Sequence, residues 1–349
     1  MELDTSKLGQ PVEVGQIGRE LKKLWEASGG ATTRASLINF AIYCEGADAG
    51  ERNTELINEF TRSHACRALL IIAEPSAPET KIGAWINAHC HLSRAGAKQV
   101  CCEQISFVLE GRASNLIPNI VFSNLDSDLP LILWWQGEFP QPIDEQLWAW
   151  VDRLVFDSQK WSNPAEQFTR LLDSLEKIQS RLALCDLNWT RSLHLRQALA
   201  QMFDHPENRS ILERLTVVKI SYAADFRLTA LLLVGWFAAQ LRLEFVRHEG
   251  EQIFLRKSGG SEVSFHLTEE EGRSISRCYA CSGDAAVEVT RVGNGDFFHV
   301  EVQLPEGRIF RHLLPAGSNQ SPSLLAEELA LGGRHRVYLK ALAVAKALL

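Results

Sequence analysis

The sequence predicts an α/β protein with two domains and α+β character overall. Its 349 residues exceed the length at which one hydrophobic core usually stops growing. The first half alternates apolar segments with amphipathic helical segments, which is typical of a mostly parallel or mixed sheet. The last third changes to short alternating segments separated by turns, which indicates an antiparallel sheet. We therefore expect an α/β domain over residues 1–183. Over residues 184–349 we expect a helical segment, an antiparallel β-sheet and a C-terminal helix.

The first half opens with a helix over residues 14–27, because Ile17, Leu21 and Leu24 fall on one helical face. Asn163 and Pro164 are a typical N-cap and first-turn residue for another helix that follows them. Strands are expected at residues 36–44, 67–75, 84–92, 99–111, 129–135 and 153–158, and further helices at residues 54–65, 113–125, 144–151 and 163–182.

The stretch from residue 186 to residue 241 is mostly helical in pattern, with one strand over residues 215–223. It ends in an apolar run from Leu228 to Leu241. This run is shorter than the roughly 17 to 25 residues that a membrane-spanning helix needs. We therefore expect a buried helix here and no membrane partner.

The segments after residue 242 alternate with period two. In one of them Phe298, Val300 and Val302 fall on one face, and His299 and Glu301 fall on the other. This pattern is typical of an antiparallel sheet with one buried face. Strands are expected at residues 243–248, 251–257, 262–267, 285–292, 298–304 and 308–314, and closing helices at residues 321–330 and 334–349.

Composition narrows the classes of function. With 46% hydrophobic and 23% charged residues the chain is an ordinary globular protein. A net charge of −7 argues against a nucleic-acid partner, since such a partner needs a concentrated basic face. The N-terminal residues have no apolar core, so we expect no signal peptide and a cytoplasmic location. In that compartment the eight cysteines are expected to be reduced thiols rather than a disulfide framework.

Cys278 and Cys281 form a Cys-x-x-Cys motif. Such a pair serves metal binding, dithiol redox chemistry or simple core packing. His299 and His312 lack the spacing that would complete a zinc site, so we expect no metal. Three steps along a strand separate Cα atoms by about 10 Å, so a disulfide requires the chain to turn between the two cysteines. The pair is our redox candidate, with buried thiols as the alternative.

Other motifs indicate structure rather than chemistry. Cys101 and Cys102 are adjacent in an expected strand, point to opposite faces and suit burial as small apolar groups. His89 and His91 share a strand face without a third metal ligand nearby in the sequence. No Gly-x-Ser-x-Gly elbow, Walker loop or Gly-x-Gly-x-x-Gly fingerprint follows any expected strand. We therefore expect no catalytic residues and no cofactor.

The segment LPLILWWQGEFP, residues 129–140, places two tryptophans at the end of a strand. Period-two geometry points Trp134 and Trp135 to opposite faces, so they cannot line one pocket. We expect one ring to be buried beneath a covering helix. The other should lie at the carboxyl end of the strand, beside Gln136 and Gly137.

Several segments taken in order resemble a known family. They are RSHACRALLIIAEP, WINAHCHL, QVCCEQISF, DLPLILWWQGEFP, CDLNWTRSLHLRQALAQMFD and ALLLVGWFAAQLRL. Together they resemble the glucose-6-phosphate dehydrogenase assembly proteins called OpcA, over about residues 56–243. The most specific elements are the paired tryptophans and the DLNWTR motif at residues 186–191.

The resemblance implies a non-catalytic partner of glucose-6-phosphate dehydrogenase. Such a partner promotes the active oligomer, activates the enzyme allosterically and supports NADPH supply by the oxidative pentose phosphate pathway. It also implies thioredoxin as a partner, since redox control in photosynthetic members acts through cysteines. The candidates for contact with the dehydrogenase are Trp134, Trp135, Trp189 and Arg191.

Two other functions stay open. One is an enzyme acting on a phosphorylated sugar or its lactone, with its site at the carboxyl ends of the parallel strands. Its candidate groups are His64, Arg67, Trp135 and Glu138. The other is a thiol-based redox switch that acts without the dehydrogenase.

Overall fold

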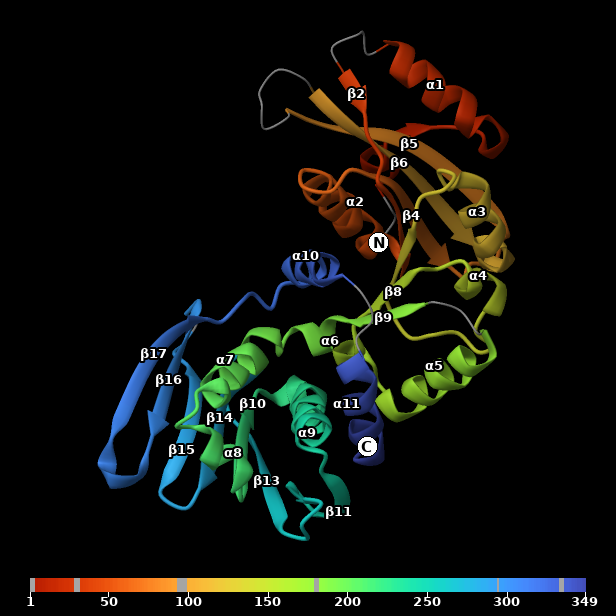
Figure 1. The fold of residues 1–349 in the computed structure, drawn as a ribbon. Helices are drawn as coiled ribbons and strands as arrows, with labels where there is room; N and C mark the ends of the chain where they lie inside the picture. The colour runs from red at the N-terminus through yellow and green to blue at the C-terminus, as the bar shows by residue number, and fades with distance from the viewer. Residues whose placement is uncertain (1–3, 28–31, 93–98, 179–181, 294, 333–335) are drawn as a thin grey trace. The chain divides into compact units, whose positions relative to one another are not determined.

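A computed structural model describes residues 4–27, 32–92, 99–178, 182–293, 295–332 and 336–349 (Figure 1). The α/β fold class predicted from the sequence is confirmed. The chain forms two compact units, Met1–Phe156 with Thr169–Cys185, and Asp157–Phe168 with Asp186–Leu349. Residues 157–168, which the sequence pattern placed in the first domain, thus belong to the second unit. Asp157 and Ser158 explain this, because both side chains are bonded to residues of the second unit.

The first unit is built on one mixed sheet. In the described residues its order is β1-β5-β6-β4-β3-β7-β8-β9, and β2 pairs with the start of β6. The neighbours from β6 to β8 are parallel, while β5 is antiparallel to β6. The strands are β1 Gln10–Pro11, β2 Thr32–Arg34, β3 Ile38–Glu45, β4 Cys66–Glu74, β5 Lys81–Leu92, β6 Gln99–Glu110, β7 Leu131–Trp135, β8 Arg153–Phe156 and β9 Ala183–Asp186.

The central strands β3, β4 and β7 are buried along nearly their whole length. A parallel sheet is covered on both faces, which explains why these strands have continuous apolar sequences. Helices α2 and α3 lie on opposite sides of β4 (Figure 1). The helices are η1 Thr5–Leu8, η2 Val14–Gln16, α1 Ile17–Ala27, α2 Ala47–Phe60, η3 Gly111–Leu116, α3 Ile117–Asn124, α4 Glu145–Ala149 and α5 Pro164–Ile178.

Helix α5 begins as predicted. The backbone N–H of Glu166 donates to Oδ1 of Asn163 at 3.3 Å, so Asn163 is the N-cap. Pro164 occupies the first helical position, where its missing N–H removes no helical hydrogen bond.

The second unit contains the other sheet, with the order β11-β12-β13-β10-β14-β15-β16-β17 in the described residues. All neighbours are antiparallel except β10 and β13, which are parallel. The predicted one-sided burial is confirmed in β16, where Phe298, Val300 and Val302 are buried. The strands are β10 Val217–Tyr222, β11 Glu244–Glu249, β12 Gln252–Arg256, β13 Glu262–Glu269, β14 Ile275–Ser282, β15 Ala285–Arg291, β16 Phe297–Gln303 and β17 Ile309–Pro315.

The helices of the second unit include one that is almost wholly apolar. Residues 228–238 of helix α9 are all buried, as predicted for this segment. By length and composition alone, Ala224–Leu241 could cross a membrane, and 61% of it is buried in the fold. The helices are η4 Ser158–Lys160, α6 Leu187–Thr190, α7 Leu193–Asp204, α8 Arg209–Glu213, η5 Ala224–Phe226, α9 Arg227–Leu241, η6 Pro305–Gly307, α10 Ser321–Leu331 and α11 Arg336–Ala347.

Candidate functional site

The paired tryptophans belong to the core of the first unit. Trp134 is 2% exposed and Trp135 is 5% exposed. The Trp135 ring stacks on Tyr43 of β3 with centroids 3.8 Å apart, and its Nε1–H donates to the carbonyl oxygen of Glu138 at 3.0 Å. Trp135 does end its strand as predicted, but its ring is buried there too. Neither ring offers surface to a partner in this structure, so their contact with a partner stays a prediction that this burial does not favour.

Trp189 and Arg191 are also buried, at 4% and 9% exposure, so their contact with a partner likewise stays a prediction that this burial does not favour. The Arg191 guanidinium donates two hydrogen bonds to the Asp157 carboxylate, at 2.7 and 2.6 Å. A two-bond arginine–carboxylate pair fixes geometry as well as charge. Arg191 therefore holds residue 157 against helix α6.

Asp186 is the centre of a buried polar network around the same motif. Its carboxylate accepts hydrogen bonds from Ser158, from the backbone N–H of Asn188 and from the hydroxyl of Tyr338. Burial raises the pKa of Asp186 to about 7, although the bonds from Ser158 and Asn188 oppose that rise. The DLNWTR motif thus organises the start of helix α6 rather than a binding surface.

Cys278 and Cys281 do not form the turn that dithiol chemistry needs. Both lie in the regular strand β14, where Cys278 faces the buried side and Cys281 is half-buried on the other side. Burial raises the pKa of the Cys278 thiol to about 12, which makes it a poor nucleophile. The prediction of a redox pair at these positions is wrong, because side chains three residues apart on a strand point to opposite faces.

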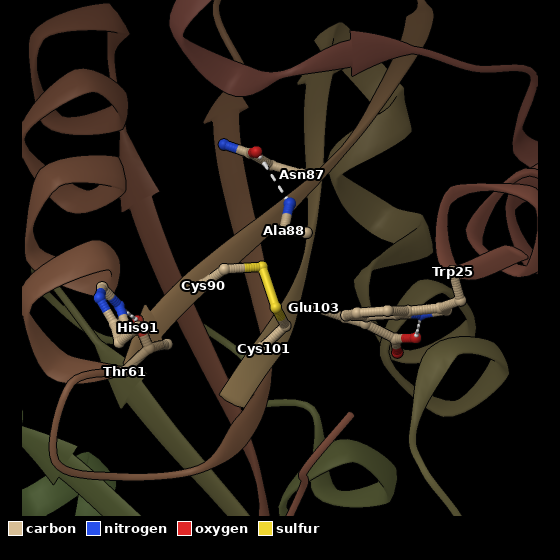
Figure 2. The surroundings of a disulfide bond; sticks show 8 residues. All are labelled: Trp25, Thr61, Asn87, Ala88, Cys90, His91, Cys101 and Glu103. Carbon is tan, nitrogen blue, oxygen red and sulfur yellow. Dashed lines mark hydrogen bonds between the residues drawn. A yellow bond between two sulfur atoms is a disulfide. The ribbon is translucent and has the colours of Figure 1, made fainter. Parts of the chain in front are cut away.

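A disulfide joins Cys90 of β5 to Cys101 of β6 (Figure 2). The expectation that all eight cysteines are reduced, and that Cys101 is only a packing residue, is therefore wrong in this structure. The two residues are direct partners in the antiparallel register, with Cα atoms 4.1 Å apart. Cys90 is half-buried and Cys101 is fully buried. A solution thiol can therefore reach the pair only through the Cys90 sulfur.

A second pair of cysteines lies next to the disulfide in the sheet. Cys66 and Cys102, on the neighbouring strands β4 and β6, are both buried and hydrogen-bonded to each other. The hydrogen bond from Cys66 lowers the pKa of Cys102 to about 7. Cys102 therefore carries the most acidic thiol whose pKa shift is resolved in the described residues.

Glu103 holds a charged cluster on the same strand. Its carboxylate accepts Trp25 Nε1–H at 2.5 Å, as Figure 2 shows, and two bonds from Arg67 at 2.9 and 2.8 Å. Arg34 adds a second cation at 3.0 Å. The carboxylate is thus compensated on all sides. The cluster ties helix α1 and strand β2 to the sheet.

The four groups proposed for an enzyme site do not come together in one site, although Trp135 contacts Glu138. Arg67 is the second residue of β4, whereas Trp135 is the last residue of β7. Because these strands run parallel, the two residues lie at opposite ends of the strands. His64 precedes β4 and stacks on Phe60. These positions correct the prediction of one site at the carboxyl edge. In the described ranges no three His, Cys, Asp or Glu side chains are grouped as a metal site requires.

The strand order β6-β4-β3-β7-β8-β9 matches the doubly wound order 3-2-1-4-5-6. In that topology a dinucleotide binds at the switch point, here the carboxyl ends of β3 and β7. The structure has a crevice of about 640 Å³ beside the loop from β3 to α2. Gly46 makes the tight turn there with φ of 85°.

The residues of this crevice do not fit a dinucleotide. Counted from Gly46, the second and third glycines of Gly-x-Gly-x-x-Gly fall at Asp48 and Glu51. Asp48 stands in the first turn of α2, where the backbone would have to approach the pyrophosphate. Glu45 and Glu74 also line the crevice. The three carboxylates outnumber the one guanidinium, Arg52, that also lines the crevice, so its net charge opposes the phosphates that such a site must hold.

Two family models match the chain, and both are described as parts of a glucose-6-phosphate dehydrogenase subunit. The model of its N-terminal domain matches residues 57–173. The model of its C-terminal domain matches residues 182–342. Together they cover well over half of the chain.

Two cyanobacterial relatives carry the name OxPP cycle protein OpcA. The protein from Synechococcus elongatus is 24% identical over 324 residues, which is 84% of this chain and 70% of the relative. The protein from Synechocystis sp. is 26% identical over 184 residues, which is 52% of this chain and 38% of the relative. The alignment to the second relative thus spans well under half of that protein.

Solved structures with a similar arrangement include two oxidoreductases. A levoglucosan dehydrogenase in complex with NADH and L-sorbose aligns over 90% of this chain and 96% of its own, with 12% identity and a TM-score of 0.49. The aldose-aldose oxidoreductase of Caulobacter crescentus, with glycerol, aligns over 89% of this chain and 96% of its own, with 12% identity and the same TM-score of 0.49. Similarity at this level assigns no activity to the chain.

Proposed function

The chain belongs to the OpcA family of glucose-6-phosphate dehydrogenase assembly proteins, and from this premise we propose that it binds that dehydrogenase and activates it without catalysing a reaction itself. The match of both family models along the chain is the observation that carries the proposal. The carboxylates in the switch-point crevice and the separation of the four candidate groups support a non-catalytic role. Increased flux through the oxidative pentose phosphate pathway, and more NADPH, would follow.

The proposed mechanism is a shift of population. A partner that binds the active oligomer of the dehydrogenase more tightly than the inactive form favours the active oligomer. By thermodynamic linkage, substrate that favours the active form must also tighten binding of the partner. Activation of the dehydrogenase and the substrate-dependent affinity for the partner therefore report the same coupling free energy.

The test uses purified dehydrogenase from the same organism, with and without the full chain. We expect a higher kcat/KM, a shift in oligomer mass by light scattering, and tighter association when glucose 6-phosphate is present. A complex that forms with no change in rate, KM or oligomer would contradict activation. If no complex forms at all, the partnership itself is contradicted.

The partner surface is expected among exposed apolar side chains, since the four sequence candidates are buried. Trp150 is 67% exposed and Leu313 is 56% exposed, one in each unit. Trp150→Glu and Leu313→Glu are suitable probes, with Trp135→Phe as the matched control for a buried ring. Weaker association with one of the two glutamate variants would locate the face that meets the dehydrogenase.

We further propose that thioredoxin acts on the Cys90–Cys101 bond. A thioredoxin dithiol would attack the sulfur of Cys90, giving two thiols here and a thioredoxin disulfide, with two electrons and two protons transferred. The half-exposed Cys90 and the disulfide itself support this site over Cys278 and Cys281, which are free thiols in one regular strand. Thiol counting after thioredoxin treatment should gain two thiols in the native chain and none in Cys90→Ser/Cys101→Ser.

An enzyme acting on a phosphorylated sugar or its lactone is the second candidate. It is tested because the sequence leaves it open. A turnover screen with pentose-phosphate intermediates, with and without NADP⁺, should detect no product.

We also propose a cytoplasmic location without membrane or nucleic-acid partners. The net charge of −7 supports the absence of a nucleic-acid partner. Fractionation of cells and a gel-shift assay test these.

A further inference from the structure

The second unit contains a cavity of about 360 Å³ at the N-terminus of helix α11. Arg336, Val337 and Tyr338, the first three residues of the helix, line it. Trp189 and Arg196 line the same cavity from the region of α6 and α7. The volume is within the range of small-molecule sites.

The start of helix α11 brings positive potential to this cavity. The first N–H groups of a helix lack partners within the helix, and its N-terminus carries about half a positive charge. Helix α11 has 12 residues and no acidic residue in its first turn. Its own side chains therefore do not neutralise that charge.

Arg196 supplies a second, independent positive group. The residue is 8% exposed, and its guanidinium stacks on the Trp189 ring at 3.5 Å from the centroid. Nε donates to Ser192 Oγ at 3.1 Å and one terminal nitrogen donates to the carbonyl oxygen of Trp189 at 3.0 Å. A guanidinium has five N–H donors. Among the described residues the other donors of Arg196 have no acceptor.

The charge of Arg196 also lacks a counter-ion. In the described part of the chain no carboxylate forms an ion pair with it. Glu328 acts on it through the Coulomb field, but that carboxylate accepts the Thr190 hydroxyl at 2.7 Å instead of bonding Arg196. Burial of a charge without a bonded counter-ion costs several kcal/mol. A bound anion would recover that cost.

From this convergence we infer that the cavity is a binding site for a small phosphate ester. The α11 N-terminus and the guanidinium of Arg196 bind the phosphoryl oxygens, and Arg336 completes the charge at the rim. Charge-assisted bonds of this kind are among the strongest that a neutral-pH site makes. The rings of Trp189 and Tyr338 provide an aromatic wall for the organic part of the ligand. The site belongs to the isolated chain and does not depend on the dehydrogenase.

The test is isothermal titration of the full native chain with inorganic phosphate and with glucose 6-phosphate at low ionic strength. We expect saturable binding and a rise in the melting temperature with ligand concentration. Tighter binding of the ester would show that the organic part is recognised, and equal affinities would show that the phosphoryl group alone is. If neither probe gives a binding heat or a shift in melting temperature, the inference is overturned.

Arg336→Gln provides the decisive variant, since Arg336 is exposed and forms no ion pair in the described residues. We expect its affinity for phosphate to fall about tenfold. Lys346→Gln, at the other end of the same helix, removes the same charge and should bind as the native chain does. Equal affinities of these two variants would contradict the site. Arg196→Met serves as a second variant, read only where circular dichroism shows that it folds.

Discussion

Helices α2 and α11 both begin at the wall of a cavity, and the net charges of the side chains that line the two cavities are opposite, although Arg52 also lines the α2 crevice. At α2 the sequence puts Asp48 in the first turn, and Glu45 and Glu74 line the same crevice. At α11 there is no acid in the first turn, and Arg196 and Arg336 line the cavity. The partial positive charge of a helix N-terminus is the same in both.

The difference shows that fold position does not choose the ligand. The α2 crevice lies where a doubly wound sheet binds a dinucleotide, yet its carboxylates oppose phosphate. The α11 cavity is lined by no strand residue, yet its side chains favour phosphate. Side-chain charge within the first turn decides between these outcomes. The predictions below test that contrast, from the largest expected effect to the smallest.

Arg191→Met should produce the largest effect. It leaves Asp157 buried without its partner, so we expect the free energy of unfolding to fall by about 3 to 5 kcal/mol. Asp48→Asn at the exposed start of α2 should change it by less than about 0.5 kcal/mol. Urea denaturation followed by tryptophan fluorescence compares the two. Similar losses in the free energy of unfolding would mean that the two charged side chains contribute equally to stability.

Asp186→Asn should remove a pH dependence from the second unit. Because the folded pKa of about 7 lies above the model value of 3.8, the stabilisation from protonated Asp186 is fully present below pH 4. It is lost as pH rises through 7, by about 1.4 kcal/mol for each unit of pKa difference. Unfolding free energies of both proteins between pH 4 and pH 8 measure this. A slope that persists in Asp186→Asn would assign it to other groups.

Reduction of the Cys90–Cys101 bond should affect the first unit only. The bond closes a short loop with a sequence separation of 11, so its loss should lower the free energy of unfolding by about 2 to 3 kcal/mol. The same loss is expected for Cys90→Ser/Cys101→Ser without reductant. Phosphate affinity in the second unit should not change. A joint change would show that the units are energetically coupled.

Val337→Asp should turn the start of α11 into a copy of the start of α2. Val337 is 37% exposed, so an acid fits there and should stabilise the helix by about 0.3 to 1 kcal/mol. Phosphate affinity should fall about tenfold, because the new carboxylate repels the anion. Titration calorimetry and thermal melting measure the two effects. Unchanged affinity would place the anion elsewhere.

The helices and most strands follow closely from the sequence, with four strands missed: β1, β2, β9 and β14. The burial of β14 does not alternate, since Ile275 and Cys278 are both buried although they lie three residues apart. A register shift opposite Ser221 and Tyr222 accounts for this. A bulge adds one residue to one strand only, so period-two patterns fail across it. Because no strand is evident at Cys278 and Cys281 from the sequence, both a redox pair in a turn and buried thiols are open there until the structure is seen.

The sequence by itself determined the family, the α/β class and the apolar helix α9, because these depend on local periodicity and on short motifs. It also determined that Trp134 and Trp135 serve opposite faces, but not that both are buried. Only the tertiary structure placed Cys90 opposite Cys101 and brought Arg196 to the start of α11. Strand register and the packing of distant helices depend on contacts between residues far apart in the chain. No local pattern encodes those contacts.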